Sequence, residues 1–327
     1  MLALFIAVRH PFHPLAVLSF FAACCSSANA DILINPTFES SITSNPNAAT
    51  IEAGIDQAIS NIESFIANPI TVRIEFGSMN TGLGQSSTFT NDLSYSQYRS
   101  DLANNQILSS NDSLALASLP VASTNPVNGN AEVVLTLPNL RAIGQTALGN
   151  NGGGFDSTIT LNLSDLNLSR TGPQDSTKYD LQAVTTHEID EVLGIGGAGS
   201  ILSASGPTVP TDPVGSMDLF RFASSGARSF TTSATATAYF SINSGATKLT
   251  NFNQNGSGDF GDWATGPTPQ VQDAFGTPGV DVNLGPNELT ALDVIGYNLV
   301  AVPEPGSGTL LVSGLLAIGI LRCRRKV

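Results

Sequence analysis

Hydrophobic residues follow a helical period in one early part of the chain and a period of two in the next. Between positions 48 and 67, isoleucine or alanine recurs every three or four residues, which predicts an amphipathic helix that ends near Asn68-Pro69. The segment 71–76 alternates polar and apolar side chains and predicts a β-strand. Similar patterns predict three more strands, at 32–38, 132–137 and 157–163.

Four further helices follow from apolar spacing and from polar residues placed to cap them. One of them begins at Asp175 or Ser176, runs to Leu193 and ends at Gly194, a residue type that commonly closes helices. The other three are predicted at 95–104, at 111–119 with Asn111 as N-cap, and at 288–295 with Asn287 as N-cap.

Beyond Gly194 the pattern changes to short strands, with Ser244-Gly245 as a hairpin turn. The strands are predicted at 218–222, 229–232, 239–242 and 247–249. The sequence therefore predicts an α+β domain over 31–301, in which a mixed sheet and its helices come first and a β-rich part follows.

The first thirty residues have the layout of a secretory signal peptide. An apolar start is followed by Arg9, by a second apolar run over Leu15–Cys25, and by Ala28-Asn29-Ala30 as an A-x-A cleavage site. Lipoprotein processing at Cys24 is a competing interpretation, because the preceding residues loosely resemble a lipobox. The A-x-A site favours the signal peptide, so residues 1–30 are expected to be removed.

The last residues, 302–327, combine a short motif, an apolar run and a basic end. Val302–Gly306 reads V-P-E-P-G, and the apolar run Thr309–Leu321 has only 13 residues, whereas a stable membrane-spanning helix needs ~20. This order resembles the PEP-CTERM sorting signal of Gram-negative bacteria. The resemblance implies transient membrane attachment, processing by an exosortase, and a final place in the cell envelope, at the surface or in the extracellular matrix. A plain C-terminal anchor is the alternative.

Between these ends the chain is strongly acidic. Residues 31–300 contain 25 Asp and Glu against 8 Lys and Arg, a net charge of −17, which argues against nucleic acid as a partner and is compatible with cation binding. The three cysteines, Cys24, Cys25 and Cys323, all lie in the two end segments. The body therefore has no disulfide, and packing or metal ions must stabilise it.

One predicted helix carries residues suited to chemistry. His187-Glu188-Ile189-Asp190-Glu191 and Gly194 read H-E-x-x-E-x-x-G. Residues four apart on a helix share a face, so His187 and Glu191 can bind one ion while Glu188 lies beside them to take a proton from a water on that ion. The pattern follows the H-E-x-x-H logic of zinc peptidases, with a carboxylate in place of the second histidine. The extra negative charge weakens the Lewis acidity of a bound ion.

His187 is the only histidine outside the predicted signal peptide, which contains His10 and His13. A single histidine placed one turn before a glutamate favours a ligand role. The structural alternative is an acidic, solvent-facing helix on which His187 merely pairs with Glu191.

The helix around 185–196 is similar to the active-site helix of leishmanolysin-like and metzincin-like metallopeptidases. Three later segments also resemble PEP-CTERM-bearing metalloproteases that use H-E-x-x-E: Asp218–Phe222, Gly258–Trp263 and Leu289–Tyr297. With the helix, the resemblance covers most of the body after Thr171. The resemblance implies a metzincin-like catalytic domain, one Zn²⁺ ion and an extracellular protein substrate.

The third metal ligand departs from the compact metzincin pattern, because Gly197 stands where that ligand would be. In leishmanolysin-like enzymes a later His-Trp pair supplies it, and the resemblance therefore points to Asp262, which precedes Trp263. Asp218 is the second candidate, with Met217 beside it as a weak match to a Met-turn. Trp263 itself is expected in the core or in a pocket wall.

These residues together predict an exported zinc-dependent endopeptidase. His187, Glu191 and Asp262 are the expected metal ligands, and Glu188 is the expected general base. The alternative from the same residues is a non-catalytic surface or matrix protein with a degenerate metal site, since Glu191 replaces a histidine.

Overall fold

A four-stranded mixed sheet forms the centre of the computed structural model, which describes residues 31–105, 108–203 and 212–300. Its strands, in spatial order, are β1 (Leu33–Phe38), β2 (Thr71–Ser78), β6 (Ser157–Leu161) and β3 (Gly84–Thr88). The first three run parallel, and β3 pairs antiparallel with β6 at the edge. The predicted α+β class is confirmed, as are the strands expected near 32–38, 71–76 and 157–163.

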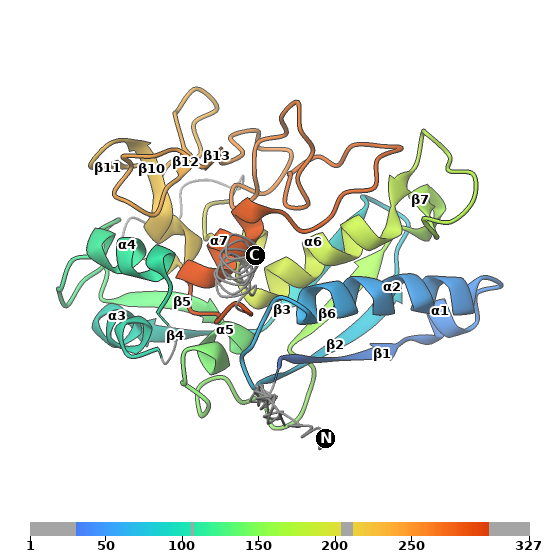
Figure 1. The fold of residues 1–327 in the computed structure, drawn as a ribbon, viewed down its shortest axis with the longest axis horizontal. Helices are drawn as coiled ribbons and strands as arrows, with labels where there is room; N and C mark the ends of the chain where they lie inside the picture. Colours follow the sequence, from blue (N-terminus) through green and yellow to red (C-terminus); the bar gives the residue numbers. More distant parts are fainter. Residues whose placement is uncertain (1–30, 106–107, 204–211, 301–327) are drawn as a thin grey trace, which may run out of the picture.

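Two helices lie side by side on one face of this sheet (Figure 1). They are α2 (Ala48–Glu63), preceded by the short α1 (Ser40–Thr43), and α6 (Leu181–Leu193). The apolar stripe predicted on α2 is buried, with Ile51, Ile55 and Ile62 fully inaccessible. Each such side chain contributes about 1.5–3 kcal/mol of burial free energy, so this face of α2 anchors the sheet against α6.

A second, three-stranded sheet lies beside the first. Its strands are β4 (Thr90–Ser94), β5 (Glu132–Thr136) and β9 (Val214–Gly215), with β5 in the middle. Three helices accompany it: α3 (Tyr95–Ala103), α4 (Ser110–Ser118) and α5 (Leu137–Ala142). The helices expected at 95–104 and 111–119 and the strand expected at 132–137 are therefore present.

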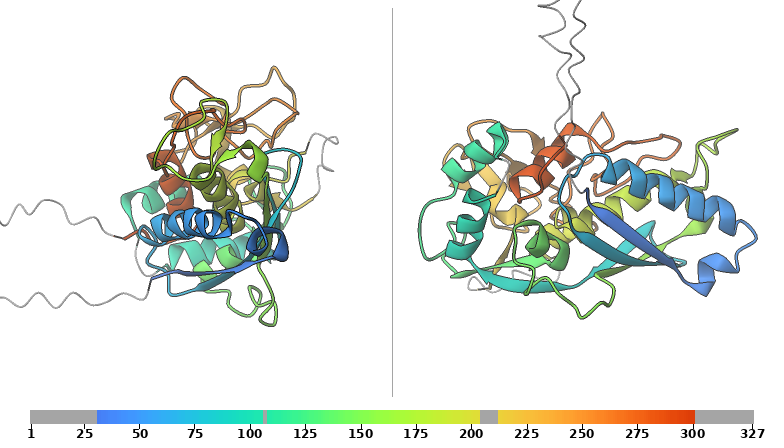
Figure 2. Two further views of the ribbon diagram at one scale, coloured as in Figure 1. Left: turned by 90° about the vertical axis from the view of Figure 1, so that its right-hand side faces the viewer. Right: turned by 60° about the horizontal axis from the view of Figure 1, so that its bottom comes forward.

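The C-terminal part consists of short strands, two-residue pairings and long loops. Its main sheet has the order β11 (Ala227–Arg228), β10 (Arg221–Ser224), β12 (Tyr239–Phe240) and β13 (Thr250–Asn251). The loops between β13 and α7 (Pro286–Val294) lie over α6, as Figure 1 and the left view of Figure 2 show. The remaining elements are η1 (Leu163–Asp165), β7 (Leu166–Asn167), β8 (Tyr179–Asp180), η2 (Gly196–Gly199) and η3 (Met217–Phe220).

Two of the predicted C-terminal strands are wrong in position. The segments 229–232 and 247–249 lie beside the paired residues Ala227–Arg228 and Thr250–Asn251 and not within them. The segment 218–222 begins as a 3₁₀ turn and becomes extended only at Arg221. Serine- and threonine-rich segments lack a clear alternation, so their registers are weakly marked in the sequence. The predicted turn at 244–245 is confirmed, and both residues have positive φ.

The start of α6 also differs from the prediction. Asp175 does not cap it, because its carboxylate accepts hydrogen bonds from the backbone and hydroxyl of Thr177 in a local turn. Ser176 is likewise outside the helix. The N-cap is Asp180, which accepts from the backbone N–H groups of Gln182 and Ala183. The predicted end is confirmed, since Gly194 adopts the left-handed conformation with φ of 105°.

Two further caps were assigned to the wrong residue. Ser109, and not Asn111, caps α4, and the Asp112 side chain completes a capping box by accepting from the Ser109 N–H. At α7 the N-cap is Gly285, and Asn287 lies within the first turn. At α4 the Ser109 hydroxyl accepts from the Asp112 N–H, so Asn111 is not needed as a cap. Gly285 has no side chain to accept with, and at α7 the Glu288 carboxylate accepts from the Gly285 N–H instead.

The predicted signal peptide (1–30) and sorting signal (302–327), with Cys24, Cys25 and Cys323, lie outside the described residues. Among the helices of the described ranges, none combines the length and apolar character that crossing a membrane requires. The division of the chain into signal, body and sorting segment stays a prediction.

We expect replacement of the α6 cap, Asp180→Ala, to lower the free energy of unfolding by about 1–2 kcal/mol, because two N–H groups lose their acceptor. Asp180 also pairs with Arg170, whose Nε lies 3.0 Å from its carboxylate. The control Asp180→Asn keeps a cap oxygen and removes only the charge. Denaturant unfolding should show a smaller loss for Asn than for Ala, and equal losses would contradict the cap assignment.

Candidate metal centre

The residues of α6 that the sequence predicts as metal ligands and general base face a cavity of about 860 Å³. The edge strand β3 lines one side of it, and the loops at 257–262 and 270–282 line the other. His187, Glu188 and Glu191 all border this cavity. The cap at Asp180 and the turn at Gly194 fix the two ends of α6, so the helix presents these side chains in a defined direction.

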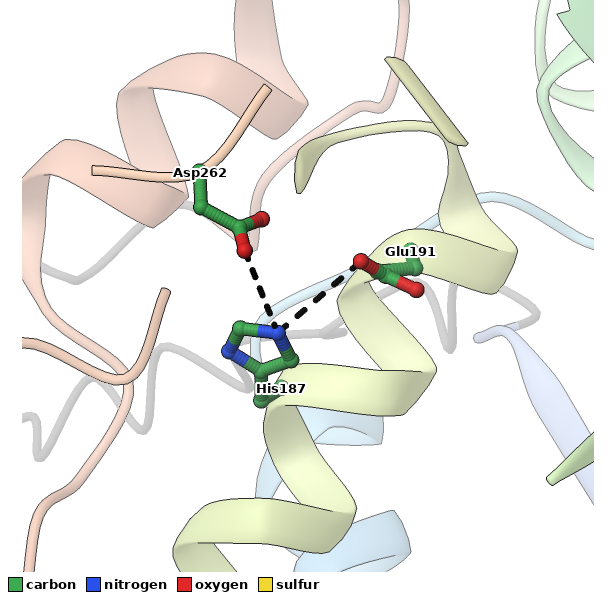
Figure 3. Close-up of side chains that lie close together, drawn as sticks. All are labelled: His187, Glu191 and Asp262. Carbon is green, nitrogen blue, oxygen red and sulfur yellow. Dashed lines mark ion pairs between the residues drawn. The ribbon is translucent and has the colours of Figure 1, made fainter. Parts of the chain in front are cut away.

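Three side chains converge at one point in the cavity. His187 Nε2 lies 3.9 Å from Glu191 Oε1 and 3.8 Å from Asp262 Oδ2 (Figure 3). One potential ligand atom from each residue lies within 4.8 Å of the other two. An imidazole nitrogen and two carboxylate oxygens at such spacing can bind one divalent cation between them, so the three residues can hold a metal ion.

The helix does not present its acidic residues to solvent, as the structural alternative required. Glu188 and Glu191 are 5% and 6% exposed, and Asp190 is fully buried. Buried carboxylates are costly unless a cation, a proton or hydrogen bonds compensate them. The excess of negative charge around His187 is therefore a feature that a bound cation would stabilise.

Neighbouring groups fix the orientation of two of the three residues. His187 Nδ1 lies 2.9 Å from the carbonyl oxygen of Val271, so Nδ1–H donates there and Nε2 is left facing the carboxylates. Glu191 accepts from Ser86 Oγ at 2.6 Å and from the N–H of Gly197 at 3.0 Å. Such outer contacts typically set the ring orientation and tautomer of a metal-binding histidine. Sequence reasoning missed both Ser86 and Val271.

Asp262 lies on a loop that buried groups hold in place. The backbone of Asn253 donates to the Asp262 carbonyl at 2.8 Å. Arg221, which is fully buried, donates to the carbonyls of Phe260 and Asn253. Its guanidinium also lies 4.4 Å from the centre of the Phe252 ring, a cation–π contact. Arg221 therefore ties the ends of the loop that carries Asp262 to the small C-terminal sheet.

Asp218, the second candidate for the third ligand, is occupied elsewhere. Its carboxylate accepts from Ser200 Oγ at 2.6 Å and from the N–H groups of Ile201 and Gly215. These bonds tie η2 and β9 together, and Asp218 is not part of the convergent group. Met217 is fully buried in the hydrophobic core beside Asp218.

Trp263 belongs to the core and not to the cavity wall. It is fully buried, stacks on Phe240 with ring centres 5.4 Å apart, and donates its indole N–H to Glu288 Oε1 at 3.1 Å. The cavity lining includes Asp262 but not its neighbour Trp263. The tryptophan therefore anchors the loop on one side while Asp262 faces the cavity on the other.

Glu188 packs directly against the edge strand. A methyl group at Gly84 of β3 would overlap its carboxylate, so a larger residue there would force the Glu188 side chain to shift. In the described part of the chain no donor is hydrogen-bonded to Glu188. Burial, and then the nearby charge of Glu191, raise the pKa of Glu188 above its ordinary value. A carboxylate of this kind is suited to accept a proton near neutral pH.

The same charges act on the other groups of the cluster. Burial alone would lower the pKa of His187, but the charges of Asp262, Glu188 and Glu191 outweigh it and raise this pKa to about 10. Burial raises the pKa of Glu191 and of Asp262, and His187 opposes the shift in both cases. Without a cation the cluster therefore retains protons at neutral pH.

No family model, curated protein or solved structure matches this chain.

We expect a divalent cation to displace protons from this cluster when it binds, because ligation requires a neutral imidazole and ionised carboxylates. Affinity for Zn²⁺ should rise between about pH 6 and about pH 8. Titration calorimetry in buffers of different ionisation enthalpy should detect the released protons. Binding without proton release, or with affinity that falls as the pH rises, would contradict the assignment of these ligands.

Proposed function

We propose that this protein is an exported, metzincin-like zinc endopeptidase that hydrolyses extracellular proteins. The supporting observation is the convergence of His187, Glu191 and Asp262 in a cavity that Glu188 also faces. Three protein ligands with one open position are typical of catalytic zinc sites, whereas structural sites close all four positions.

The residues of the cluster suit a zinc ion. His187 would bind it through Nε2, because Nδ1 is engaged with Val271, and Glu191 and Asp262 would each bind it through oxygen. A bound Zn²⁺ supplies Lewis acidity toward a peptide carbonyl and toward water. Two anionic ligands reduce that acidity relative to a site of neutral histidines, so more of the catalysis must come from the protein.

Glu188 is the group that would move the proton. Its raised pKa and its freedom from hydrogen-bond donors in the described residues suit it to take a proton from the attacking water. The same carboxyl group then passes that proton to the amine that leaves when the C–N bond breaks. The close packing of Glu188 against β3 keeps it beside the cleft throughout.

The edge strand β3 suits the site to a peptide substrate. It pairs with β6 on one side, and Gly84, Gln85 and Ser86 line the cavity. An extended peptide can add to such an edge through backbone hydrogen bonds, which recognise any sequence. Ser86 also holds Glu191, so a peptide bound along β3 would lie next to the metal ligands.

The export of the protein is a second part of the proposal and rests on the two ends of the chain. The A-x-A site after Ala28 and the V-P-E-P-G motif with its short apolar run and basic end support export followed by exosortase processing. An acidic body without cysteine fits a secreted protein whose stability does not depend on disulfides. Nothing in its charge suits it to bind nucleic acid.

Replacement of the general base, Glu188→Gln, should lower kcat/KM on casein by at least about 100-fold, since general-base catalysis contributes 10²–10⁴-fold. Zinc content should stay stoichiometric by elemental analysis, because Glu188 is not a ligand. The matched control is Glu52→Gln on α2, outside the cavity lining, which should keep full activity. Activity that survives in Glu188→Gln, or a wild-type protein without bound metal, would leave the non-catalytic surface protein as the better description.

Stability measurements show whether Glu188→Gln is folded. The pKa of Glu188 is raised in the folded protein, so its ionisation disfavours the fold as the pH rises from the unfolded pKa through the folded one. The metal-free variant should therefore be more stable than wild type at about pH 8 and nearly equal below about pH 4. Loss of activity together with this gain in stability would assign Glu188 a chemical role and not a structural one.

Removal of residues 302–327 should release the protein from the envelope fraction, because the segment proposed to be recognised by the exosortase is gone. Cell fractionation and immunoblotting measure the shift. Neutral replacement of the four basic residues near the end is a milder control that alters topology signals without removing the motif. Unchanged retention after the deletion would contradict the sorting proposal and leave the catalytic proposal unaffected.

A further inference from the structure

Gln272 is a buried amide beside the metal ligands. It is fully inaccessible to solvent and follows Val271, whose carbonyl binds His187. Its Nε2 lies 3.0 Å from Asp262 Oδ1 and 3.3 Å from His187 Nε2. Its Oε1 is buried and has no hydrogen-bond partner among the described residues. A buried acceptor without a partner is rare and calls for a physical explanation.

The position of this amide is tightly fixed. The backbone N–H of Gln272 donates to Glu288 Oε1 at 3.3 Å, and its carbonyl accepts from the Trp263 N–H at 2.8 Å. A methyl group at Gly196 would overlap the Gln272 amide, so η2 closes over it from the other side. The side chain cannot move away from the cluster without displacing these neighbours. It can, however, turn about its last bond, which exchanges the oxygen and the nitrogen.

In the observed orientation the amide nitrogen donates to Asp262 Oδ1 and faces His187 Nε2. A cation held between Nε2 and the Asp262 carboxylate would leave the amide N–H pointing at a positive charge. A half-turn of the amide removes this repulsion and directs the unpartnered oxygen toward the cation.

We propose that Gln272 is a fourth protein ligand of the metal ion, bound through Oε1 after this half-turn. The proposal rests on the metal site of the proposed function and extends it. Gln272 adds an oxygen donor without adding charge. The ion would then have four protein ligands and an open fifth position for water, without the loss of Lewis acidity that another carboxylate would cause. With one nitrogen and three oxygen donors, the site should accept Mn²⁺ better relative to Zn²⁺ than a histidine-rich site does.

Cobalt substitution in the full-length protein tests this proposal, because the visible absorption of Co²⁺ reports its coordination number. Gln272→Met removes both amide ends at similar volume, and Gln272→Glu keeps an oxygen in the same place. The matched control is Gln270→Met, which removes an amide from the same loop. The Gln270 side chain contacts Thr250 and Asn287 and not the cluster.

We expect Gln272→Met to weaken Co²⁺ binding about 10–100-fold and to intensify its visible bands, as the loss of one ligand requires. Gln272→Glu should keep the wild-type band pattern and bind Co²⁺ at least as tightly. Gln270→Met should change neither property. If Gln272→Met fails to fold by circular dichroism, Gln272→Glu alone decides, and altered bands or weaker binding in it would overturn the proposal.

Two other outcomes would also overturn the proposal. In one, Gln272→Met binds Co²⁺ like wild type. In the other, it binds more weakly with an unchanged spectrum, which would show that the amide only positions Asp262. A wild-type protein that binds no divalent cation defeats this inference and the proposed function together. Ligand loss in Gln272→Met without peptidase activity in wild type would defeat the proposed function alone.

Discussion

Four carboxyl groups are buried around or beside the imidazole of His187: those of Glu188, Asp190, Glu191 and Asp262. Four carboxyl groups with one basic partner cannot all be ionised in a medium of low polarity unless something positive joins them. In the metal-free protein, bound protons reduce the negative charge. A divalent cation can do the same at the point where His187, Glu191 and Asp262 converge. Asp190 is the extreme case: neither of its oxygens has a partner among the described residues, and burial keeps its pKa well above the ordinary value.

The surrounding fold is organised to keep these groups in place. The cap at Asp180 and the turn at Gly194 define the ends of the helix that carries three of them. Arg221 and Trp263 fix the loop that supplies Asp262, through main-chain hydrogen bonds and aromatic packing. The central sheet and α2 supply the apolar core on which this arrangement rests. Stability that depends on packing makes disulfides unnecessary in the body of the chain.

Sequence reasoning found what carries a strong local signal. The periodicity of α2, the alternation in β2 and the H-E-x-x-E spacing on α6 each follow directly from the residues. Asp262 came from a resemblance to a known family, because no local pattern links it to a helix some 70 residues earlier. Ser86, Val271 and Gln272 could not be found in this way. Val271 acts through its carbonyl, which every residue has, and the other two matter only because the fold brings β3 and a distant loop to α6.

The edge strand β3 was missed because Gly84–Thr88 contains no apolar side chain. That same composition also limits self-association of the folded protein. Exposed strand edges promote self-association, and aggregation spreads fastest through long, flat, hydrophobic ones. β3 is short and polar, and its free side borders a cleft with acidic walls instead of open solvent. A second folded copy of the chain therefore cannot easily dock there, whereas a single flexible strand can enter.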